Sequence, residues 1–365
     1  MTTRRQTLLS LAAIPMAMTQ ARPSSAATPS PAVWRMPDEA EPHARTWMAF
    51  GAQADIWGKK LLPVVQQNLA DIALAIARFE PVSMLVRSGD MATARRLMGN
   101  RVELVEQAVD DFWMRDTGPV FVTSAEGKKA GVDFNFNGWG KKQKHAEDAR
   151  VAAFIAAHAG VPRLTTALVL EGGGIEVDGH GTAIITESCV LNPNRNPGVS
   201  KAACEAELKR LLGVEKVLWL PGIKGKDITD GHTDFYARFA APGLVVAGYD
   251  ADPASYDHAV TKRHLTMLKE MTDARGKKLE VVVIEGPGTV RERHAGKDFA
   301  AGYINFYVCN GAVIAPQFGD TKADASARDT LKDLFPKREV VQLNIDGVAA
   351  GGGGIHCTTQ QEPAV

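Results

Sequence analysis

The sequence lacks the features that mark most nucleic-acid-binding, membrane-spanning and metal-binding proteins. Lys and Arg together number 42, as do Asp and Glu, so the formal net charge is zero, and no basic run is interleaved with aromatic residues. No internal stretch reaches the roughly 20 apolar residues that a membrane-spanning helix needs. The four cysteines are not spaced as C-x-x-C, which argues against a zinc or dithiol redox motif. We therefore expect no nucleic-acid partner, no stable membrane insertion and no metal site.

The first 27 residues have the composition of an export signal. Arg4 and Arg5 form a basic pair, an apolar stretch follows at 8–18, and small residues at 24–27 suit cleavage. This pattern favours a twin-arginine signal peptide, with a Sec signal or an unstructured tail as the alternatives. The mature protein is then expected to be periplasmic or secreted. An oxidising compartment would permit a disulfide among the cysteines, but isolated buried cysteines are common.

After a linker at 28–33, we expect a single domain at 34–365, because a chain that is 45% hydrophobic can bury a large core. Five short apolar runs with strand character recur about every 50 to 65 residues in that domain. The runs span 102–105, 168–170, 217–220, 281–284 and 340–343.

Segments with helical periodicity precede these runs, and polar or glycine-rich corners follow them. Apolar residues three and four apart, with charges between, predict helices at 146–158, 201–212, 255–271 and 323–335. A unit of strands and helix is thus repeated five times, and the units could form one open sheet or pack radially around a channel. The corners carry most of the reactive side chains, and a radial array would bring them together. This favours the radial arrangement.

Four glycines at 351–354 stand almost next to a lone cysteine, Cys357, with His356 before it. A cysteine can act as a nucleophile, and glycines let the backbone bring it close to other groups without side-chain clashes. The alternative is a buried structural cysteine, which is the more common case.

A histidine and a carboxylate stand two positions apart at His232 and Asp234. On a strand, residues two apart point to the same face, so the imidazole and the carboxylate could serve one pocket. Histidine is suited to proton transfer near neutral pH. The alternative is a solvated turn with a surface histidine.

Two more corners hold acids that could face the same site. Trp113 and Asp116 could form an aromatic wall and an anionic floor for a flat cation, or Arg115 could pair with a nearby acid and leave Trp113 in the core. Glu171 precedes three glycines and could hold His232 in its imidazolium form. The alternative there is a glycine-rich hairpin that turns at 177–181.

Together these residues suggest that a thiolate attacks a planar, cationic carbon. A guanidinium group fits, because two carboxylates can each accept a pair of its N–H donors.

The sequence also closely resembles the agmatine deiminase family, which includes the bacterial peptidyl-arginine deiminases. The resemblance runs from Met36 to Pro363 and rests on the motifs DDFWMRDTGP, FNFNGWG, EGGGIEVDGHGT, LNPNRNP, DGHTDFYARF, YINFYVCNGAVIAPQFGD and GGGGIHCTTQQEP. It implies the α/β fold of the guanidine-modifying enzymes, the five-bladed propeller called the pentein fold. That fold agrees with the fivefold repeat.

The resemblance further implies a mechanism and a role for each site residue. A cysteine attacks the guanidinium carbon, ammonia leaves, and water hydrolyses the covalent thiouronium intermediate, without a metal or an organic cofactor. The matching residues are the nucleophile Cys357, the general acid and base His232, the guanidinium-binding Asp116 and Asp234, the histidine's partner Glu171, and Trp113, Trp139 and Asn305 lining the substrate site.

The segment 136–140 bears on the substrate. In the peptidyl-arginine branch of the family, arginines in this segment hold a substrate carboxylate, whereas here Gly138 and Gly140 flank Trp139, as in the agmatine branch. The resemblance thus favours deimination of agmatine, which has no carboxylate, to N-carbamoylputrescine and ammonia. The alternatives are a periplasmic deiminase of arginine peptides or of another guanidino compound, and a guanidine-binding protein without turnover. A homo-oligomer is compatible with the sequence.

Overall fold

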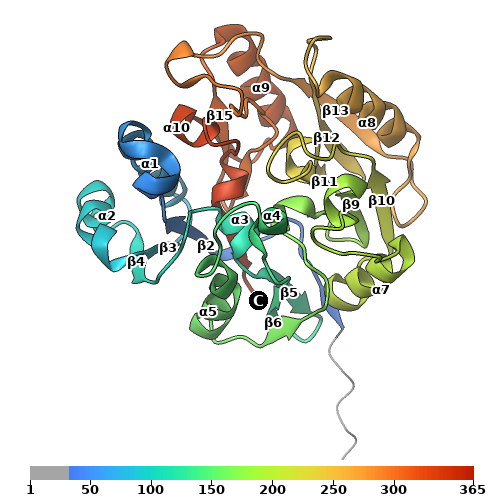
Figure 1. Ribbon diagram of the computed structural model, residues 1–365. Coiled ribbons are helices and arrows are strands. Elements are labelled where there is room, and N and C mark those ends of the chain that lie inside the picture. The colour runs from blue at the N-terminus through green and yellow to red at the C-terminus, as the bar shows by residue number, and fades with distance from the viewer. Residues whose placement is uncertain (1–32) are drawn as a thin grey trace, which may run out of the picture. The chain divides into compact units, whose positions relative to one another are not determined.

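The part of the chain that the structure describes contains five separate β-sheets, with helices between their strands. In the computed structural model, residues 33–365 form one compact unit, and its sheets have the strand orders β1-β5-β6-β7, β10-β9-β8, β11-β12-β13, β14-β15-β16 and β17-β2-β3-β4. Figure 1 shows these sheets around a common centre, with helices α2, α5, α7, α8 and α9 towards the outside. This mixed α/β arrangement is consistent with the five-bladed propeller that the family resemblance implies.

The predicted signal peptide at 1–27 and all but the last residue of the predicted linker at 28–33 lie outside the described residues. Both stay predictions.

The strands contain two to eight residues each. Their bounds are β1 Trp34–Arg35, β2 His43–Phe50, β3 Val82–Val86, β4 Glu103–Glu106, β5 Val120–Ser124, β6 Lys129–Asp133, β7 Arg163–Thr165, β8 Glu176–Val177, β9 Thr182–Thr186, β10 Lys216–Leu220, β11 Ala237–Ala241, β12 Leu244–Tyr249, β13 Glu280–Glu285, β14 Tyr307–Cys309, β15 Ala312–Gln317, β16 Glu339–Asn344 and β17 Gln360–Pro363.

The helices include several single turns. The α-helices are α1 Ala54–Ile76, α2 Met91–Met98, α3 Met114–Thr117, α4 Gly138–Lys141, α5 Val151–His158, α6 Glu187–Val190, α7 Lys201–Leu212, α8 His258–Glu270, α9 Thr321–Leu334 and α10 Asp346–Ala349. The 3₁₀ turns are η1 Ser88–Asp90, η2 Asp148–Arg150, η3 Gly172–Gly174, η4 Thr233–Phe235, η5 Glu292–His294 and η6 His356–Thr358.

One connection recurs in all five sheets. An antiparallel strand pair is followed by a helix and then by a third strand that lies parallel to its neighbour. The crossover helices are α1, α5, α7, α8 and α9. A parallel pair needs such a crossover because the chain must return to the same end of the sheet. The fivefold repeat predicted from the sequence is therefore present, although the run at 102–105 is β4, which follows the third strand β3 of its unit.

The fifth sheet joins the two ends of the described chain. Strand β17 pairs antiparallel with β2, with Gln360 opposite Trp47, and the Trp47 indole N–H donates to Glu362 at 2.8 Å. Because β17 begins three residues after Cys357, this pairing fixes the position of the cysteine relative to the first part of the domain.

Helix α7 shows how the local sequence sets these elements. Its N-cap Ser200 accepts a hydrogen bond from the backbone N–H of Ala203, and Gly213 ends the helix in the left-handed conformation at φ 67°. Leu208 and Leu211 are buried between those ends. The bounds match the predicted 201–212.

The other predicted helices differ from the structure by one to five residues at their ends. The segment predicted at 146–158 becomes η2 followed by α5. In η2, the Asp148 carboxylate accepts hydrogen bonds from the backbone N–H groups of Asp110 and Asp111. The longest helix, α1, was not among those singled out from the sequence. Gly58 has non-helical angles in it and Pro63 follows, which breaks the periodic pattern.

Four of the five predicted strand runs overlap strands β4, β10, β13 and β16. The prediction for 168–170 was wrong, since the strand of that sheet is β7, further upstream. The backbone of Val169 is instead paired with a side chain. Asn196 accepts from the N–H of Val169 at 3.0 Å and donates to its carbonyl at 2.8 Å. A side-chain amide thus replaces a neighbouring strand.

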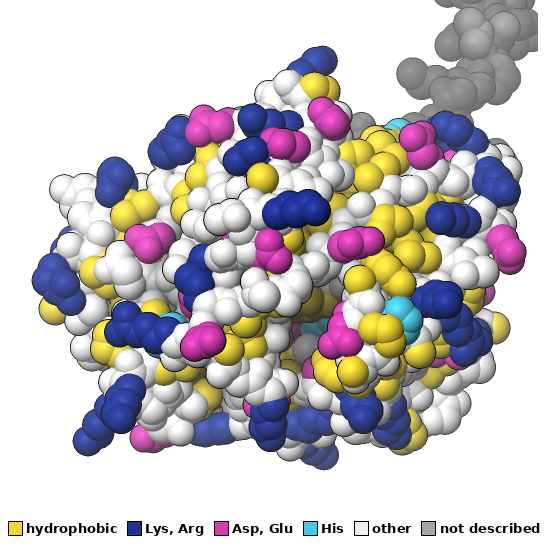
Figure 2. Space-filling model, turned by 90° about the horizontal axis from the view of Figure 1, so that it is seen from above, with side chains coloured by type: hydrophobic (Ala, Val, Ile, Leu, Met, Phe, Trp, Pro, Cys, Tyr) yellow, Lys and Arg dark blue, Asp and Glu magenta, His cyan; other side chains and the backbone are white. Residues whose placement is uncertain are grey.

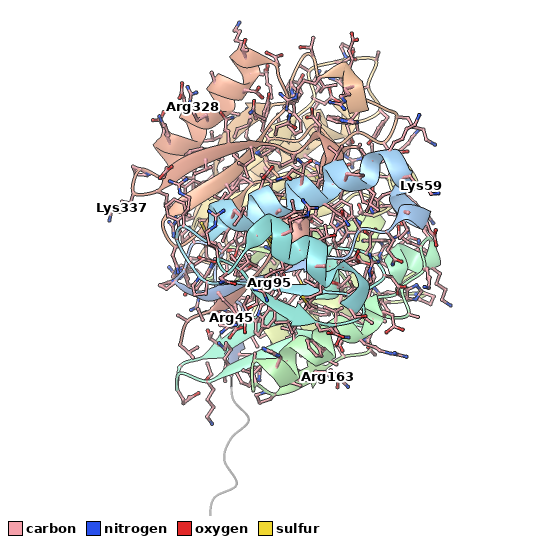
Figure 3. The ribbon with its side chains drawn as sticks, turned by 90° about the vertical axis from the view of Figure 1, so that its left-hand side faces the viewer. Arg45, Lys59, Arg95, Arg163, Arg328 and Lys337 are labelled. Atoms are coloured by element: carbon pink, nitrogen blue, oxygen red, sulfur yellow. The ribbon has the colours of Figure 1, made fainter. Side chains whose placement is uncertain are left out.

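Charged side chains of both signs share the outer surface. Figure 2 shows Lys and Arg among Asp and Glu over the face seen from above. In Figure 3, α1 and α2 lie in front of the strands, with Lys59 on α1 and Arg95 on α2. Within residues 33–365, the structure contains no helix that combines the length and the apolar character of a membrane span. The four cysteines are buried and free.

Candidate active site

Five titratable side chains from different corners of the fold meet at its centre. Cys357 lies in η6, Asp116 in α3 and Asp234 in η4, while His232 and Glu171 immediately precede η4 and η3. Each is at most 6% exposed. The corners converge as the radial arrangement predicted, although His232 and Asp234 lie just before and within a 3₁₀ turn and not on a strand.

Gly173 marks the point around which three of these groups converge. A Cβ atom on this residue would lie 2.6 Å from Nδ1 of His232, 2.8 Å from Oδ1 of Asp116 and 3.2 Å from Oδ2 of Asp234. The backbone N–H of Gly173 donates to Oδ1 of Asp116 at 3.2 Å. The glycine therefore allows an imidazole and two carboxylates to approach one small space.

The imidazole of His232 lies between two carboxylates. Its Nε2 is 3.2 Å from Oε2 of Glu171, and its Nδ1 is 3.7 Å from Oδ1 of Asp116. Although burial opposes the charged ring, Asp116, Cys189 and Glu171 together hold the pKa of His232 well above its usual value. The imidazolium is therefore the resting form, which can donate a proton to a leaving group.

Arg195 holds Glu171 in place and was missed by the sequence reasoning. Its Nε donates to both oxygens of Glu171, at 2.8 and 3.0 Å, and its Nη1 donates to Oδ2 of Asp230 at 2.9 Å. The motif LNPNRNP, which contains Arg195, was the available signal.

The hairpin that was the alternative for the corner after Glu171 is present as well. Strands β8 and β9 pair antiparallel and are joined by the turn that follows Val177.

Cys357 contacts an acid and an amide. Its Sγ lies 3.6 Å from Oδ2 of Asp234 and accepts from Nδ2 of Asn305 at 3.4 Å. Burial raises the pKa of the Cys357 thiol well above its usual value, and the negative charges of Asp234 and Asp116 add to the shift. A cation bound between these two acids would offset their charge and favour the thiolate.

Asp116 is fixed by a tryptophan. The indole N–H of Trp139 donates to Oδ2 of Asp116 at 2.9 Å, and burial raises the pKa of this carboxyl to about 6, even though His232 opposes the shift.

Trp113 is buried and packs against Phe112 with ring centroids 4.3 Å apart. Arg115 pairs with Glu39, at 3.0 Å, and not with an acid in its own segment.

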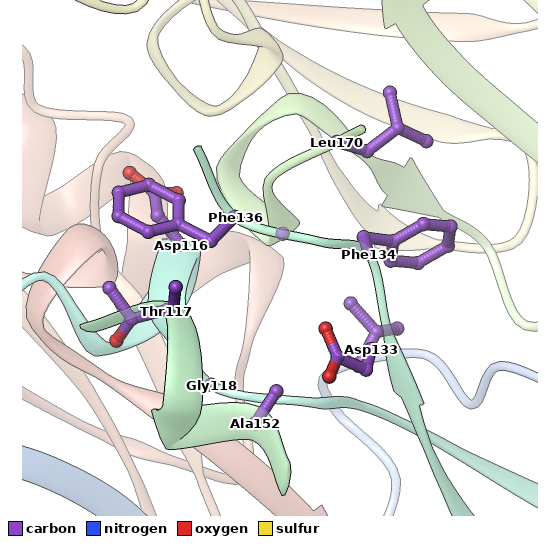
Figure 4. A pocket seen from close by; sticks show the side chains of 11 residues that line it. Asp116, Thr117, Gly118, Asp133, Phe134, Phe136, Ala152 and Leu170 are labelled. Atoms are coloured by element: carbon purple, nitrogen blue, oxygen red, sulfur yellow. The ribbon is translucent and has the colours of Figure 1, made fainter. Parts of the chain in front are cut away.

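Figure 4 shows a small cavity that Asp116 helps to line. Its other labelled lining residues include the apolar Phe134, Phe136, Ala152 and Leu170 and the polar Thr117 and Asp133. The rings of Phe136 and Trp139 pack edge to face at 5.0 Å. The residues around this cavity thus belong to the packing next to Asp116 and Trp139.

The glycines around Trp139 are required by the turn itself. Trp139 has φ 54°, between Gly138 at 71° and Gly140 at 82°. A Cβ on Gly138 would lie 2.5 Å from the carbonyl oxygen of Gln143, and one on Gly140 would lie 2.3 Å from the side chain of Asn194. An arginine at either position would therefore disrupt the turn that carries Trp139, and could not simply extend into the site.

The glycines before Cys357 are needed for a similar reason. A Cβ on Gly351 or Gly353 would lie within 2.2 Å of the rings of Trp57 or Trp113, and one on Gly354 would lie 2.4 Å from Asn305. Because these glycines have no side chains, the backbone at 351–354 can pass close to Trp57, Trp113 and Asn305.

Asp234 carries an oxygen atom that is available to a ligand. Oδ1 is buried and has no hydrogen-bond partner within residues 33–365. A buried carboxylate oxygen without a donor is costly. A guanidinium N–H would supply the missing donor.

One set of side chains has the composition of a metal site. Ligand atoms of Glu171, Cys189 and His232 all lie within 4.8 Å of one another. Both oxygens of Glu171, however, already accept hydrogen bonds from the Arg195 guanidinium, and this positive charge would repel a metal ion bound to the same carboxylate. These contacts favour a structural ion pair over a metal centre.

Known proteins are similar to this chain in both sequence and fold. Residues 35–363 match the family described as Porphyromonas-type peptidyl-arginine deiminase. The agmatine deiminase of Pseudomonas aeruginosa is 40% identical over 360 residues, covering 92% of this chain and 97% of that protein.

Solved structures agree with this match. The agmatine deiminase of Enterococcus faecalis superposes with a TM-score of 0.85 at 36% identity, covering 91% of this chain and 96% of the other. A dimethylarginine dimethylaminohydrolase, at 12% identity and a TM-score of 0.51, covers 87% of this chain and 99% of the other and shares the fold alone.

Proposed function

The chain belongs to the Porphyromonas-type peptidyl-arginine deiminase family, and from this premise we propose that it hydrolyses agmatine to N-carbamoylputrescine and ammonia. Homologous agmatine deiminases support this activity over almost the whole chain. The observation that carries it is the buried Asp234 carboxylate, whose Oδ1 has no donor within residues 33–365 and whose Oδ2 lies 3.6 Å from the Cys357 thiol. A guanidinium group matches both: it brings N–H donors and a planar electrophilic carbon.

Substrate binding prepares the nucleophile. The guanidinium donates to Asp116 and Asp234, and its positive charge offsets the two negative charges that raise the pKa of Cys357. The thiol then loses its proton more readily, and the thiolate attacks the guanidinium carbon to form a C–S bond.

His232 handles protons in both halves of the reaction. As an imidazolium it donates a proton to one nitrogen of the tetrahedral intermediate, the C–N bond breaks, and ammonia leaves a thiouronium cation on Cys357. The neutral imidazole then takes a proton from water while the oxygen attacks the same carbon. Loss of the thiolate and of one hydroxyl proton gives the ureido product. Glu171, held by Arg195, orients the ring throughout.

The charges near the centre favour a substrate without a carboxylate. Arg115 pairs with Glu39, and Arg195 pairs with Glu171 and Asp230. Arg238 pairs with Glu39 and Glu176. None of these three buried arginines is free to receive the α-carboxylate of an arginine, whereas agmatine carries none.

We expect kcat/KM for agmatine to exceed that for free arginine and for peptides with a C-terminal arginine by about 100-fold or more, because a desolvated carboxylate without a partner costs several kcal/mol. Release of ammonia and of ureido product from a panel of guanidino compounds would measure this ratio. A preference for arginine peptides would favour the alternative substrate and leave the deiminase chemistry in place. Binding of the panel without turnover would favour a guanidine-binding protein.

We also propose that the protein is exported to the periplasm by a twin-arginine signal, on the basis of Arg4, Arg5 and the apolar and small residues that follow. The mature protein is expected to begin near Ala27 or Thr28. The double variant Arg4→Lys with Arg5→Lys should leave the precursor in the cytoplasm, as immunoblots of cell fractions would show. Unimpaired export of that variant would indicate the Sec route.

A further inference from the structure

His356, the residue before Cys357, connects two buried carboxylates. Its Nδ1 lies 2.7 Å from Oδ2 of Asp234, and its Nε2 lies 2.9 Å from Oε2 of Glu39. The imidazole is 2% exposed, so water does not replace either contact.

These two contacts require two protons. An ionised carboxylate only accepts hydrogen bonds, and a neutral imidazole has a single N–H. A neutral ring between two ionised carboxylates would leave one pair of acceptors facing each other at hydrogen-bond distance. Burial and the positive charges of Arg115 and Arg238 lower the pKa of His356, whereas Glu39 and Asp234 oppose that shift. The two short distances nevertheless call for one proton in each contact, so the ring is held from both sides.

Glu39 is the fixed end of this group. Besides His356, its carboxylate accepts from Arg115 at 3.0 Å, from Arg238 at 2.8 Å and from the backbone N–H of Val308 at 2.9 Å. Burial opposes its charge, but Arg238, His356 and Arg115 hold the pKa of Glu39 well below its usual range. Because several rigid donors surround Glu39, its position in turn defines the position of the imidazole.

Asp234 is the functional end of the group. His356 occupies Oδ2, and this hydrogen bond lowers the pKa of Asp234 although burial opposes it. Oδ1 remains without a partner in the described chain. The hydrogen bond to Oδ2 restricts rotation of the carboxylate, so Oδ1 keeps a fixed direction while Oδ2 stays 3.6 Å from Sγ of Cys357.

We propose that His356 is a positioning residue that orients Asp234 for the substrate guanidinium, with Glu39 as its anchor. The proposal rests on the proposed deiminase function and adds a residue to it. His356 acts through Asp234, so its loss should weaken substrate binding more than it slows the chemical steps.

Two amide substitutions separate the two contacts. The side-chain N–H of asparagine can take the place of Nδ1, whereas that of glutamine can take the place of Nε2. His356→Asn should keep a donor to Asp234 and give a KM for agmatine within a few-fold of the wild-type value. His356→Gln should keep the contact with Glu39, lose the one with Asp234, and raise KM about tenfold or more with a smaller change in kcat.

His43 provides a matched control. It is a buried histidine with Nδ1 3.1 Å from Glu80 and Nε2 2.8 Å from the backbone oxygen of Glu39, and no contact with Asp234 is among its hydrogen bonds. His43→Gln should lower the melting temperature without raising KM. Equilibrium dialysis of agmatine against each variant in a Cys357→Ser background would measure binding without turnover and should give the same order.

Equal KM values for the asparagine and glutamine variants, or a KM increase in His43→Gln as large as in His356→Gln, would overturn the positioning role. The wild-type assay tests the underlying function separately. If the wild type acts on another guanidino compound, the agmatine assignment fails alone, and the same ratio of variants is measured with that compound.

Discussion

Replacement of Cys357 by serine is expected to abolish turnover, with kcat lowered by about 10⁴-fold or more. The guanidinium carbon is a weak electrophile, and an alcohol ionises far less readily than a thiol. In this site the acids next to Sγ disfavour the anion even for a thiol, so a serine hydroxyl would stay protonated even with substrate bound. Ammonia release under saturating agmatine would measure the loss.

Cys309→Ser is the matched control for this experiment. Cys309 is also a buried, free thiol, but its Sγ donates to the backbone oxygen of Ala312 and not to a residue of the site. Its replacement should leave kcat within a few-fold of the wild-type value. The unfolding temperature of Cys357→Ser should stay near that of the wild type, because the substitution is nearly isosteric.

The covalent step can be detected separately. His232→Ala slows both the departure of ammonia and the hydrolysis of the intermediate. Any adduct that forms during a long incubation with agmatine should therefore persist and add the mass of an amidine group to the peptide that contains Cys357. Normal activity of Cys357→Ser would contradict the covalent mechanism.

The repeat was predictable because each unit contains a strand and a helix with apolar residues at regular spacing, and such spacing is visible in the sequence. The exceptions have specific causes. The strand expected at 168–170 is absent because the Asn196 side chain satisfies the backbone of Val169. Helix α1 was not singled out because Gly58 and Pro63 interrupt its pattern. Single amide contacts and helix breaks of this kind leave little periodic signal.

Within the site, the residues with chemically distinctive side chains could be named from the sequence, and the structure brings Cys357, His232 and Asp234 together. The contacts by which other residues hold these side chains in place could not be predicted from the sequence. Arg195, Glu39 and His356 act through contacts to residues far away in the chain. The packing of the sheets around a common centre makes these pairs neighbours. The motif LNPNRNP marks Arg195 in the sequence, but no spacing shows that its partner is Glu171.

The glycine-rich corner after Glu171 leads to the second large effect. Gly173→Ala is expected to lower kcat/KM by about 100-fold or more, since displacements of about 1 Å at reacting groups can cost that much. The new methyl group would lie 2.6 to 3.2 Å from His232, Asp116 and Asp234 at once. All three are held by other contacts, so at least one must leave its catalytic position.

Gly174→Ala tests whether this effect comes from the site or from loss of backbone freedom. Neither glycine has a positive φ, and a Cβ on Gly174 would make only ordinary contacts, at 3.6 Å from Cys189 and 3.7 Å from His232. This variant should keep kcat/KM within a few-fold of the wild-type value. Steady-state kinetics and thermal unfolding of both variants would separate the two causes. If both substitutions lowered activity equally, or if Gly173→Ala remained fully active, the convergence of the three groups around Gly173 would not be essential for catalysis.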